Sequence, residues 1–431
     1  MLSRLDVRGL SGQALVGALP RPDPVGASDE VVASVRATLA QVRARGDDAL
    51  RELTARFDGV EIDHPSVPRA EWKRALDAIP SATRDALELA AGNLREFQQA
   101  EAAPEVSWGR DGVVVRTLRR PVERAGCYVP GGRAVYPSTV LHTAVPARVA
   151  GVGEVVVCVP PDRSGAVPDV VLAAAAIAEV DAVYRIGGAQ AIGALAYGTA
   201  TIRAVDVIVG PGNVYVAVAK REVAGEGRVG VPSSFAGPSE IVVVADGSAA
   251  PDHVAIDVIL QAEHGPDGLA WLVTWSPDLA DAVDAAVAEL SAAAPRRGEI
   301  ESTLEANGRI VLVDGPEQAM AVSNLIAPEH LELQVADPEA LVDLVRNAGA
   351  VFLGPLAPAS LGDYAAGPSH VLPTHGSARF AGALTVDDFT KPVHVVSVDQ
   401  AGFDSLAPHV IALARAEGLD AHAQSISMRQ R

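Results

Sequence analysis

The chain is poor in cysteine, because its 431 residues include only two, Cys127 and Cys158. Two cysteines form no disulfide framework, and these two do not make the CxxC pairs typical of redox motifs and zinc sites. Both lie in apolar, strand-like stretches, and we expect them to pack in the core rather than to attack a carbonyl group. The sequence therefore predicts a protein of a reducing compartment, the cytoplasm.

Basic residues, aromatic residues and long apolar runs are also scarce. Lys and Arg number 35 against 54 Asp and Glu, for a net charge of −19, and such a charge repels nucleic-acid phosphates. Aromatic residues are only 4% of the chain, so platforms for base stacking are few. The longest apolar run, Val170–Ala178, is far shorter than the roughly 20 residues of a membrane span, and Ala14–Leu19 is too short for a secretory signal. We expect no nucleic-acid partner and no membrane.

Hydrophobic residues make up 49% of the chain, which excludes intrinsic disorder. Helices are predicted first, at 28–45, 47–57 and 81–100, with Ser28 as the N-cap of the first helix and Gly46 as its end. Short apolar runs then alternate with helical stretches, which is typical of βαβ units and parallel sheets. The runs expected to be strands are 154–161, 181–186, 205–210, 240–246, 269–275, 309–313 and 350–354. After residue 384 the pattern weakens, and we expect only a helix at 408–417.

The predicted fold class is α/β, with two incomplete Rossmann-like domains, each built on a parallel sheet. The length suits roughly three domains of about 150 residues. We expect an N-terminal arm at 1–25, a discontinuous first domain made of 26–125 and 238–382, a second domain at 126–237, and a C-terminal segment at 383–431.

Three loops are rich in glycine: those at 185–190 and 209–213 each follow a predicted strand, and the one at 127–139 opens the second predicted domain. Ligands of doubly wound folds bind beyond the carboxyl ends of the strands, and glycines let the backbone approach a phosphate closely. None of the loops is a dinucleotide fingerprint, since Tyr215 occupies the place of the third glycine in GPGNVY, and no Walker A motif is present. Spacing alone leaves two interpretations open: nucleotide-binding loops or ordinary tight turns.

Histidines and carboxylates gather at the ends of hydrophobic elements. Gln261 and His264 are three residues apart in QAEH, Glu329 and His330 adjoin in APEH, and LGDYAAGPSH contains Asp363 and His370. A further histidine, His422, lies in the polar C-terminal tail. The HExxH pattern is absent, so a metal site would be dispersed and catalytic in type. Spacing alone favours Glu263 over Gln261 as a ligand, because amide oxygens are uncommon on zinc; the alternative is that each histidine is an ordinary surface residue.

Taken together, these strings resemble the histidinol dehydrogenase family. The matching stretches are YVPGGRAVYPSTVL, YRIGGAQAIGALAYGT, VDVIVGPGNVYVAVAK, AGPSEIVVVAD, QAEH, APEHLEL, NAGAVFLG, LGDYAAGPSHVLPT, ARF and EGLDAHAQS. They run from Tyr128 to Ser425 in the family's order and cover most of the chain. Several are long enough to exclude chance.

The resemblance implies a role for individual residues. Zinc, one ion per subunit, falls on Gln261, His264, Asp363 and His422, which would also contact the substrate. NAD falls on Tyr128, Gln190 and Asn213. Further substrate contacts fall on Ser239, His330, His370 and Glu417, with Ser138 a weaker candidate. The acid/base pair falls on Glu329 and His330. The family forms an intertwined homodimer, so Glu417 and His422 are expected to act in the partner's site.

The implied reaction is the four-electron oxidation of L-histidinol to L-histidine through the aldehyde, with two NAD molecules, in the last two steps of histidine biosynthesis. His330, expected to be neutral near pH 7, would take the alcohol proton, and Glu329 would activate water on the aldehyde. The chain departs from the family's pattern at His142, Thr143, Gly265 and His375, which leaves its substrate range open. The alternatives are a related dehydrogenase of another diol, a zinc-dependent hydrolase and a non-catalytic nucleotide-binding module.

Overall fold

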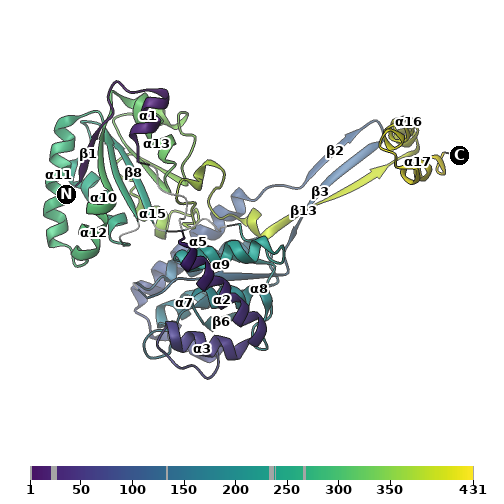
Figure 1. Ribbon diagram of the computed structural model, residues 1–431, viewed down its shortest axis with the longest axis horizontal. Helices are drawn as coiled ribbons and strands as arrows, with labels where there is room; N and C mark the ends of the chain where they lie inside the picture. Colours follow the sequence, from purple (N-terminus) through teal and green to yellow (C-terminus); the bar gives the residue numbers. More distant parts are fainter. Residues whose placement is uncertain are drawn as a thin grey trace.

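The computed structural model describes residues 2–20, 27–132, 134–232, 237, 239–265 and 268–430. The expected domain boundaries at 25–26 and 237–238 therefore fall partly outside the described residues. Within them the chain forms two parallel sheets and one antiparallel ribbon (Figure 1). The predicted α/β fold with two parallel-sheet units is confirmed.

The first unit is a six-stranded sheet in which every neighbouring pair is parallel, in the order β1-β10-β9-β8-β11-β12. Its strands are β1 (Ser3–Asp6), β8 (Glu240–Ala245), β9 (Leu269–Thr274), β10 (Gly308–Leu312), β11 (His330–Gln334) and β12 (Ala350–Leu353). One face is covered by α10 (Pro251–Ala262), α11 (Pro277–Ala293) and α12 (Arg297–Asn307). The other face is covered by α1 (Gly12–Ala18), α13 (Pro316–Ile326) and α14 (Glu339–Val342). Burial on both faces explains why its strands are continuous apolar runs.

The second unit is a four-stranded parallel sheet in the order β6-β5-β4-β7. Its strands are β4 (Arg124–Tyr128), β5 (Glu154–Val159), β6 (Ala182–Arg185) and β7 (Val207–Val209). One face packs against α4 (Arg69–Ala78), α5 (Ser81–Glu101), α6 (Pro137–Val149) and α7 (Asp169–Ile177). The opposite face packs against α2 (Asp29–Arg45), α3 (Asp47–Phe57), α8 (Gly188–Tyr197) and α9 (Val214–Gly225).

The N-terminal segments are distributed differently from the expected domains. Helices α2 to α5 were assigned to the first domain, but their apolar faces are buried on the four-stranded sheet, as Leu39 and Leu94 show. The expected arm at 1–25 instead contains β1, which adds to the edge of the six-stranded sheet through β10. Both differences have one physical cause: each parallel sheet needs apolar cover on both faces and a partner for its edge, and chain order does not say which sheet receives it.

Local helix signals were more reliable. The Ser28 hydroxyl accepts a hydrogen bond from the Val31 N–H at the start of α2, and Gly46 ends that helix at a φ of 53°. The C-terminal helix α16 (Gln400–Ala416), in contrast, does not begin at Pro408 as expected. Asp399 caps it by accepting from the Gly402 N–H, and Pro408 lies inside the helix.

A long antiparallel ribbon projects away from the two α/β units (Figure 1). It consists of β2 (Val106–Arg110), β3 (Val113–Pro121) and β13 (Thr390–Val398), and it ends in α16 and α17 (Asp420–Ser427). Figure 1 shows these helices at the far end of the ribbon, well away from both sheets. We call β2, β3, β13, α16 and α17 the ribbon arm. No helix among the described residues has both the length and the apolar character to cross a membrane.

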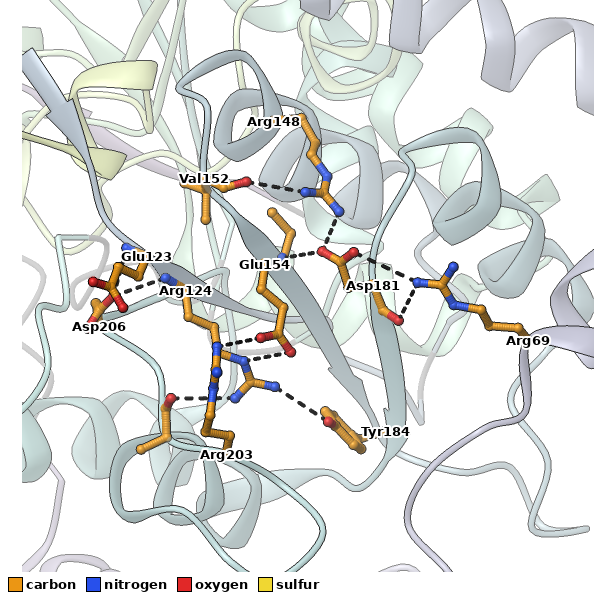
Figure 2. Close-up of polar contacts among 12 residues, drawn as sticks. Arg69, Glu123, Arg124, Arg148, Val152, Glu154, Asp181, Tyr184, Arg203 and Asp206 are labelled. Atoms are coloured by element: carbon orange, nitrogen blue, oxygen red, sulfur yellow. Dashed lines mark hydrogen bonds and ion pairs between the residues drawn. The ribbon is translucent and has the colours of Figure 1, made fainter.

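Charged residues line the amino-terminal edge of the four-stranded sheet (Figure 2). Asp206 Oδ2 accepts the backbone N–H groups of Glu123 and Arg124, each at 2.9 Å. The buried guanidinium of Arg124 pairs with Glu154 at 2.9 Å, and Arg203 pairs with the same carboxylate from the surface. This network satisfies the first N–H groups of the strands, so we interpret this edge as structural. The glycine-rich loops lie at the opposite edge.

Three short helical segments complete the described structure. They are α15 (Ala359–Tyr364) and the 3-10 turns η1 (Ser377–Arg379) and η2 (Val386–Phe389).

Candidate active site

The predicted acid/base pair and two of the four predicted zinc ligands, Gln261 and Asp363, converge at the amino-terminal edge of the six-stranded sheet. His330 is the first residue of β11, Glu240 is the first residue of the parallel neighbour β8, and Gln261 lies in the last turn of α10, which ends at the same edge. This cluster therefore does not lie beyond the carboxyl ends of strands, where ligands were expected. The glycine-rich loops do follow β4, β6 and β7, and ligand binding at them stays a prediction.

A strained turn lies directly before Glu329 and His330 and sets their position. Helix α13 ends at Ala327, which has a left-handed φ of 56° although it is not glycine, and Pro328 follows. Such a conformation costs an alanine about 1 kcal/mol, and the surrounding structure holds it in place. The Glu329 carbonyl then accepts the Ala350 N–H at 2.9 Å, which starts the pairing of β11 with β12.

His330 is the centre of the cluster. Its buried ring places Nδ1 3.1 Å from Gln261 Nε2 and 3.1 Å from the Glu240 carbonyl oxygen, while Nε2 lies 3.2 Å from Asp363 Oδ1. Glu329 Oε2 is 3.5 Å from Nδ1 and accepts the Glu240 N–H at 2.8 Å. Four elements, β8, α10, β11 and α15, thus fix one imidazole.

The electrostatics of this cluster follow from burial and from its carboxylates. Burial alone would lower the pKa of His330, but the Glu329 and Asp363 carboxylates outweigh it and hold that pKa well above its ordinary value. Burial would raise the pKa of Asp363, but its hydrogen bond with His330 lowers it overall. The expectation of a neutral imidazole near pH 7 is therefore wrong for the chain's own groups, which favour an imidazolium.

Gln261 fits a metal ligand better than Glu263 does. Its side chain is buried, its amide nitrogen faces His330, and its Oε1 has no hydrogen-bond partner among the described residues. A buried carbonyl oxygen without a donor is costly unless something else satisfies it. Glu263 is the exposed C-cap of α10. The preference for Glu263 drawn from spacing therefore finds no support in the fold.

The remaining proposed zinc ligands do not all meet. Asp363 and the exposed His264 are close enough to interact electrostatically. His422 belongs to α17 on the ribbon arm, far from α10 and α15 (Figure 1). Among the described residues of this one chain, no group of three or more His, Cys, Asp or Glu side chains is arranged to hold a metal. A complete set of the four proposed ligands would need the ribbon arm of a second copy of the chain.

The three residues expected to contact NAD lie around the carboxyl edge of the four-stranded sheet. The buried Tyr128 hydroxyl accepts the Gly188 N–H at 3.1 Å, joining the first two loops. Gly210, at a φ of 109°, packs so tightly that a Cβ there would lie 2.0 Å from the Tyr128 carbonyl oxygen. Gln190 is buried, whereas Asn213 is exposed and caps α9 through its Oδ1.

The two units meet through α6, which packs on the four-stranded sheet, and His370, which lies beside Asp363. The Thr139 hydroxyl lies 3.1 Å from His370 Nε2, and the ring of His142 stacks on that of His370. Ser138 is buried in the same helix, and Ser239 is half-buried just before β8. Glu417 is exposed on the ribbon arm, next to the end of α16, and does not meet the other residues within one chain.

Sequence reasoning missed Glu240, Thr139 and His142. Burial raises the pKa of Glu240 to about 8, and the Glu329 carboxylate adds to the effect, although the His375 N–H donates to it at 2.9 Å. The sequence does mark these positions. Glu240 is a carboxylate at the start of the otherwise apolar run EIVVVA, and Thr139 and His142 are polar residues in the mostly apolar stretch that becomes α6. Neither reveals its partner.

Comparison with known proteins gives a consistent result over almost the whole chain. The Histidinol dehydrogenase family model matches residues 23–430. A histidinol dehydrogenase of Parasynechococcus marenigrum (strain WH8102) is 47% identical over 418 residues, covering 97% of this chain and 95% of the relative. One of Methanothermobacter thermautotrophicus is 45% identical over 404 residues, covering 94% of each. The crystal structure of histidinol dehydrogenase from Elizabethkingia anophelis superposes with a TM-score of 0.94 at 33% identity, over 99% of this chain and 98% of that one. The chain belongs to the histidinol dehydrogenase family.

Proposed function

We propose that this chain oxidises L-histidinol to L-histidine through the aldehyde, using two NAD molecules in turn. The observation that carries the proposal is the buried His330 imidazole, held by Gln261 and Asp363 beside Glu329, together with glycine-rich loops on the second sheet. This geometry combines a proton acceptor, a second carboxylate and a cofactor surface. The comparisons give no support to a hydrolase or to a non-catalytic module.

The two residues of the pair have different tasks in the proposed reaction. When the alcohol carbon gives its hydride to NAD, His330 accepts the hydroxyl proton and the aldehyde forms. Glu329 then takes a proton from water as the water oxygen adds to the aldehyde carbon, and His330 returns its proton to the aldehyde oxygen, which gives the hydrate. The hydrate gives a second hydride to a second NAD while His330 accepts a hydroxyl proton, and the product is the carboxylic acid, which ionises to the carboxylate. The backbone N–H of Glu240 holds Glu329 Oε2, so we assign the proton transfer from water to Oε1.

The donor set suits a zinc ion held by Gln261, His264, Asp363 and, from a second subunit, His422. The orphaned Gln261 Oε1 supports this assignment. Zinc, when bound, would supply positive charge that orients the amino and imidazole nitrogens of the substrate. His330 must lose its proton before it can act as a base. Ser239, His370 and Glu417 complete the proposed substrate contacts.

The ribbon arm supports an intertwined homodimer. It exposes large apolar side chains along both its strands and its helices: Val106, Trp108, Val396, Leu413 and Met428. An isolated arm with so few buried residues gains little from folding on its own. A second copy of the chain would cover it and would bring Glu417 and His422 to a site that lacks them. A cytoplasmic location remains a prediction.

The stoichiometry of NADH formation tests the function. Purified protein given limiting L-histidinol and excess NAD should form two NADH per substrate, measured by absorbance at equilibrium. Glu329→Gln should stop near one NADH and accumulate aldehyde, because only the second half-reaction needs activated water. Removing metal with a chelator should abolish turnover, and adding Zn²⁺ should restore it. One NADH per substrate from the unaltered chain, or full activity after chelation, would contradict the proposal.

A further inference from the structure

His142 has no role in the site as assigned so far, yet it is in direct contact with it. The residue lies on α6, is fully buried, and its ring stacks on that of His370 with centroids 4.0 Å apart and planes 9° from parallel. His370 itself is only half-buried. The pair therefore runs from the core toward the outside, with His142 as the inner ring.

Hydrogen bonds determine which nitrogen of His142 carries the proton. Its Nδ1 accepts the backbone N–H of His370 at 2.9 Å, so that nitrogen is unprotonated and a neutral ring carries its proton on Nε2. The His142 carbonyl oxygen also accepts the Ser369 hydroxyl at 2.9 Å. Burial, followed by the neighbouring His370, holds the pKa of His142 well below its ordinary value, in agreement with a neutral ring.

His370 is fixed by three groups. Its Nδ1 lies 2.8 Å from the Asp363 carbonyl oxygen, which only accepts, so Nδ1 carries a proton. Its Nε2 lies 3.1 Å from the Thr139 hydroxyl, and its ring plane is set by the stack with His142. Thr139 and His142 are three residues apart and thus on one face of α6. Helix α6, which packs on the four-stranded sheet, therefore orients the imidazole of His370.

We propose that His142 is a positioning residue for substrate binding, which holds the backbone and the ring of His370 in the orientation that meets the substrate. The inference rests on the proposed function, because His370 is the substrate contact through which His142 acts. A purely apolar side chain would fill the same space but would leave the His370 N–H without an acceptor. The imidazole at this buried position is therefore explained by its two contacts with His370, the hydrogen bond to the backbone N–H and the ring stack.

The test separates binding of the two substrates. His142→Phe keeps a ring to stack but removes the acceptor, and it should raise KM for L-histidinol about ten-fold, the effect expected for one lost hydrogen bond, with KM for NAD within about two-fold. His142→Asn, whose amide oxygen can replace Nδ1 as acceptor, should recover KM for L-histidinol to within about three-fold of the unaltered chain. Thr139→Val, nearly isosteric, should raise the same KM.

Leu141→Ala is the matched control, because Leu141 is buried in the core on the same helix. It should lower the melting temperature at least as much as His142→Phe and leave KM for L-histidinol unchanged. The proposal is overturned if Leu141→Ala raises that KM equally, if KM for both substrates rises together, or if His142→Phe changes neither. Should His142→Phe not fold, His142→Asn and Thr139→Val decide the question by the same split.

Nitrogen-15 NMR of labelled histidines tests the geometry without turnover. His370 should be observed with its proton on Nδ1 and His142 with its proton on Nε2, each assigned by substitution. The opposite assignment at either ring would refute the positioning argument. Failure of the unaltered chain to oxidise L-histidinol would instead refute the proposed function, so the two failures are distinguishable.

Discussion

Individual residues in this protein owe their chemistry to what is buried beside them. His330 would be an ordinary imidazole at the surface, but Glu329 and Asp363 raise its pKa in the interior. The cysteines show the opposite outcome. Both are fully buried, and burial raises the pKa of the Cys127 thiol to about 12 and that of Cys158 further still. Neither forms a thiolate at neutral pH, and the predicted core role fits this environment.

The first prediction concerns these thiols. A chain carrying Cys127→Ala and Cys158→Ala should keep kcat and both KM values within about two-fold, because an aldehyde intermediate is handled by Glu329 and water rather than by sulfur. The melting temperature should fall by a few degrees, since each change removes one buried atom. Steady-state kinetics and thermal denaturation measure the two effects. A loss of kcat beyond about a hundred-fold with an intact fold would indicate a catalytic thiol.

At the scale of elements, the sequence predicted the features that depend only on residues close together in the chain. The cap at Ser28 and the apolar runs of β5, β8 and β9 are properties of short segments, and they were found where expected. Strands β2, β3 and β13 were not predicted. Polar and apolar residues are mixed along these strands. Strand β3 forms because it pairs with a segment far along the chain, Val113 with Val398 and Pro121 with Thr390.

The second prediction concerns the network at the amino edge of the four-stranded sheet (Figure 2). Glu154→Ala should lower the free energy of unfolding by about 3 kcal/mol, because it leaves the buried Arg124 guanidinium unpaired. Arg203→Ala removes only the exposed partner of the same carboxylate and should cost less than about 1 kcal/mol. Chemical denaturation of both variants gives the comparison. Equal costs would show that the burial of Arg124 does not matter.

At the scale of the whole molecule, the proposed site residues lie in parts that one chain does not bring together. The sheet edge near His330, the loops near Tyr128 and the helix α6 meet within the chain, whereas α17 lies at the end of the ribbon arm (Figure 1). His422 and Glu417 are exposed there. A dimer in which arms cross would complete two equivalent sites, which is the geometry of a closed two-fold assembly.

The third prediction follows from that geometry. A chain with Glu329→Gln and His330→Ala should be inactive, and so should a chain with His422→Ala. Co-expressed, they should regain about a quarter of the unaltered activity, because half of the dimers are mixed and one of the two sites in each mixed dimer is intact. Activity of the purified mixture measures this. Recovery no greater than the sum of the parents would mean that each site is built within one subunit.

The sequence by itself determined the alternation of strands and helices, the scarcity of reactive thiols and the motif residues that mark the family, because each depends on residue type and near neighbours. Only the tertiary structure decided which sheet the N-terminal helices cover, that His330 lies at the amino edge of its sheet, and that Gln261 rather than Glu263 faces it. The reason is sequence separation. The contact between His142 and His370 joins residues 228 apart, and no local periodicity records which distant segment a helix face will meet.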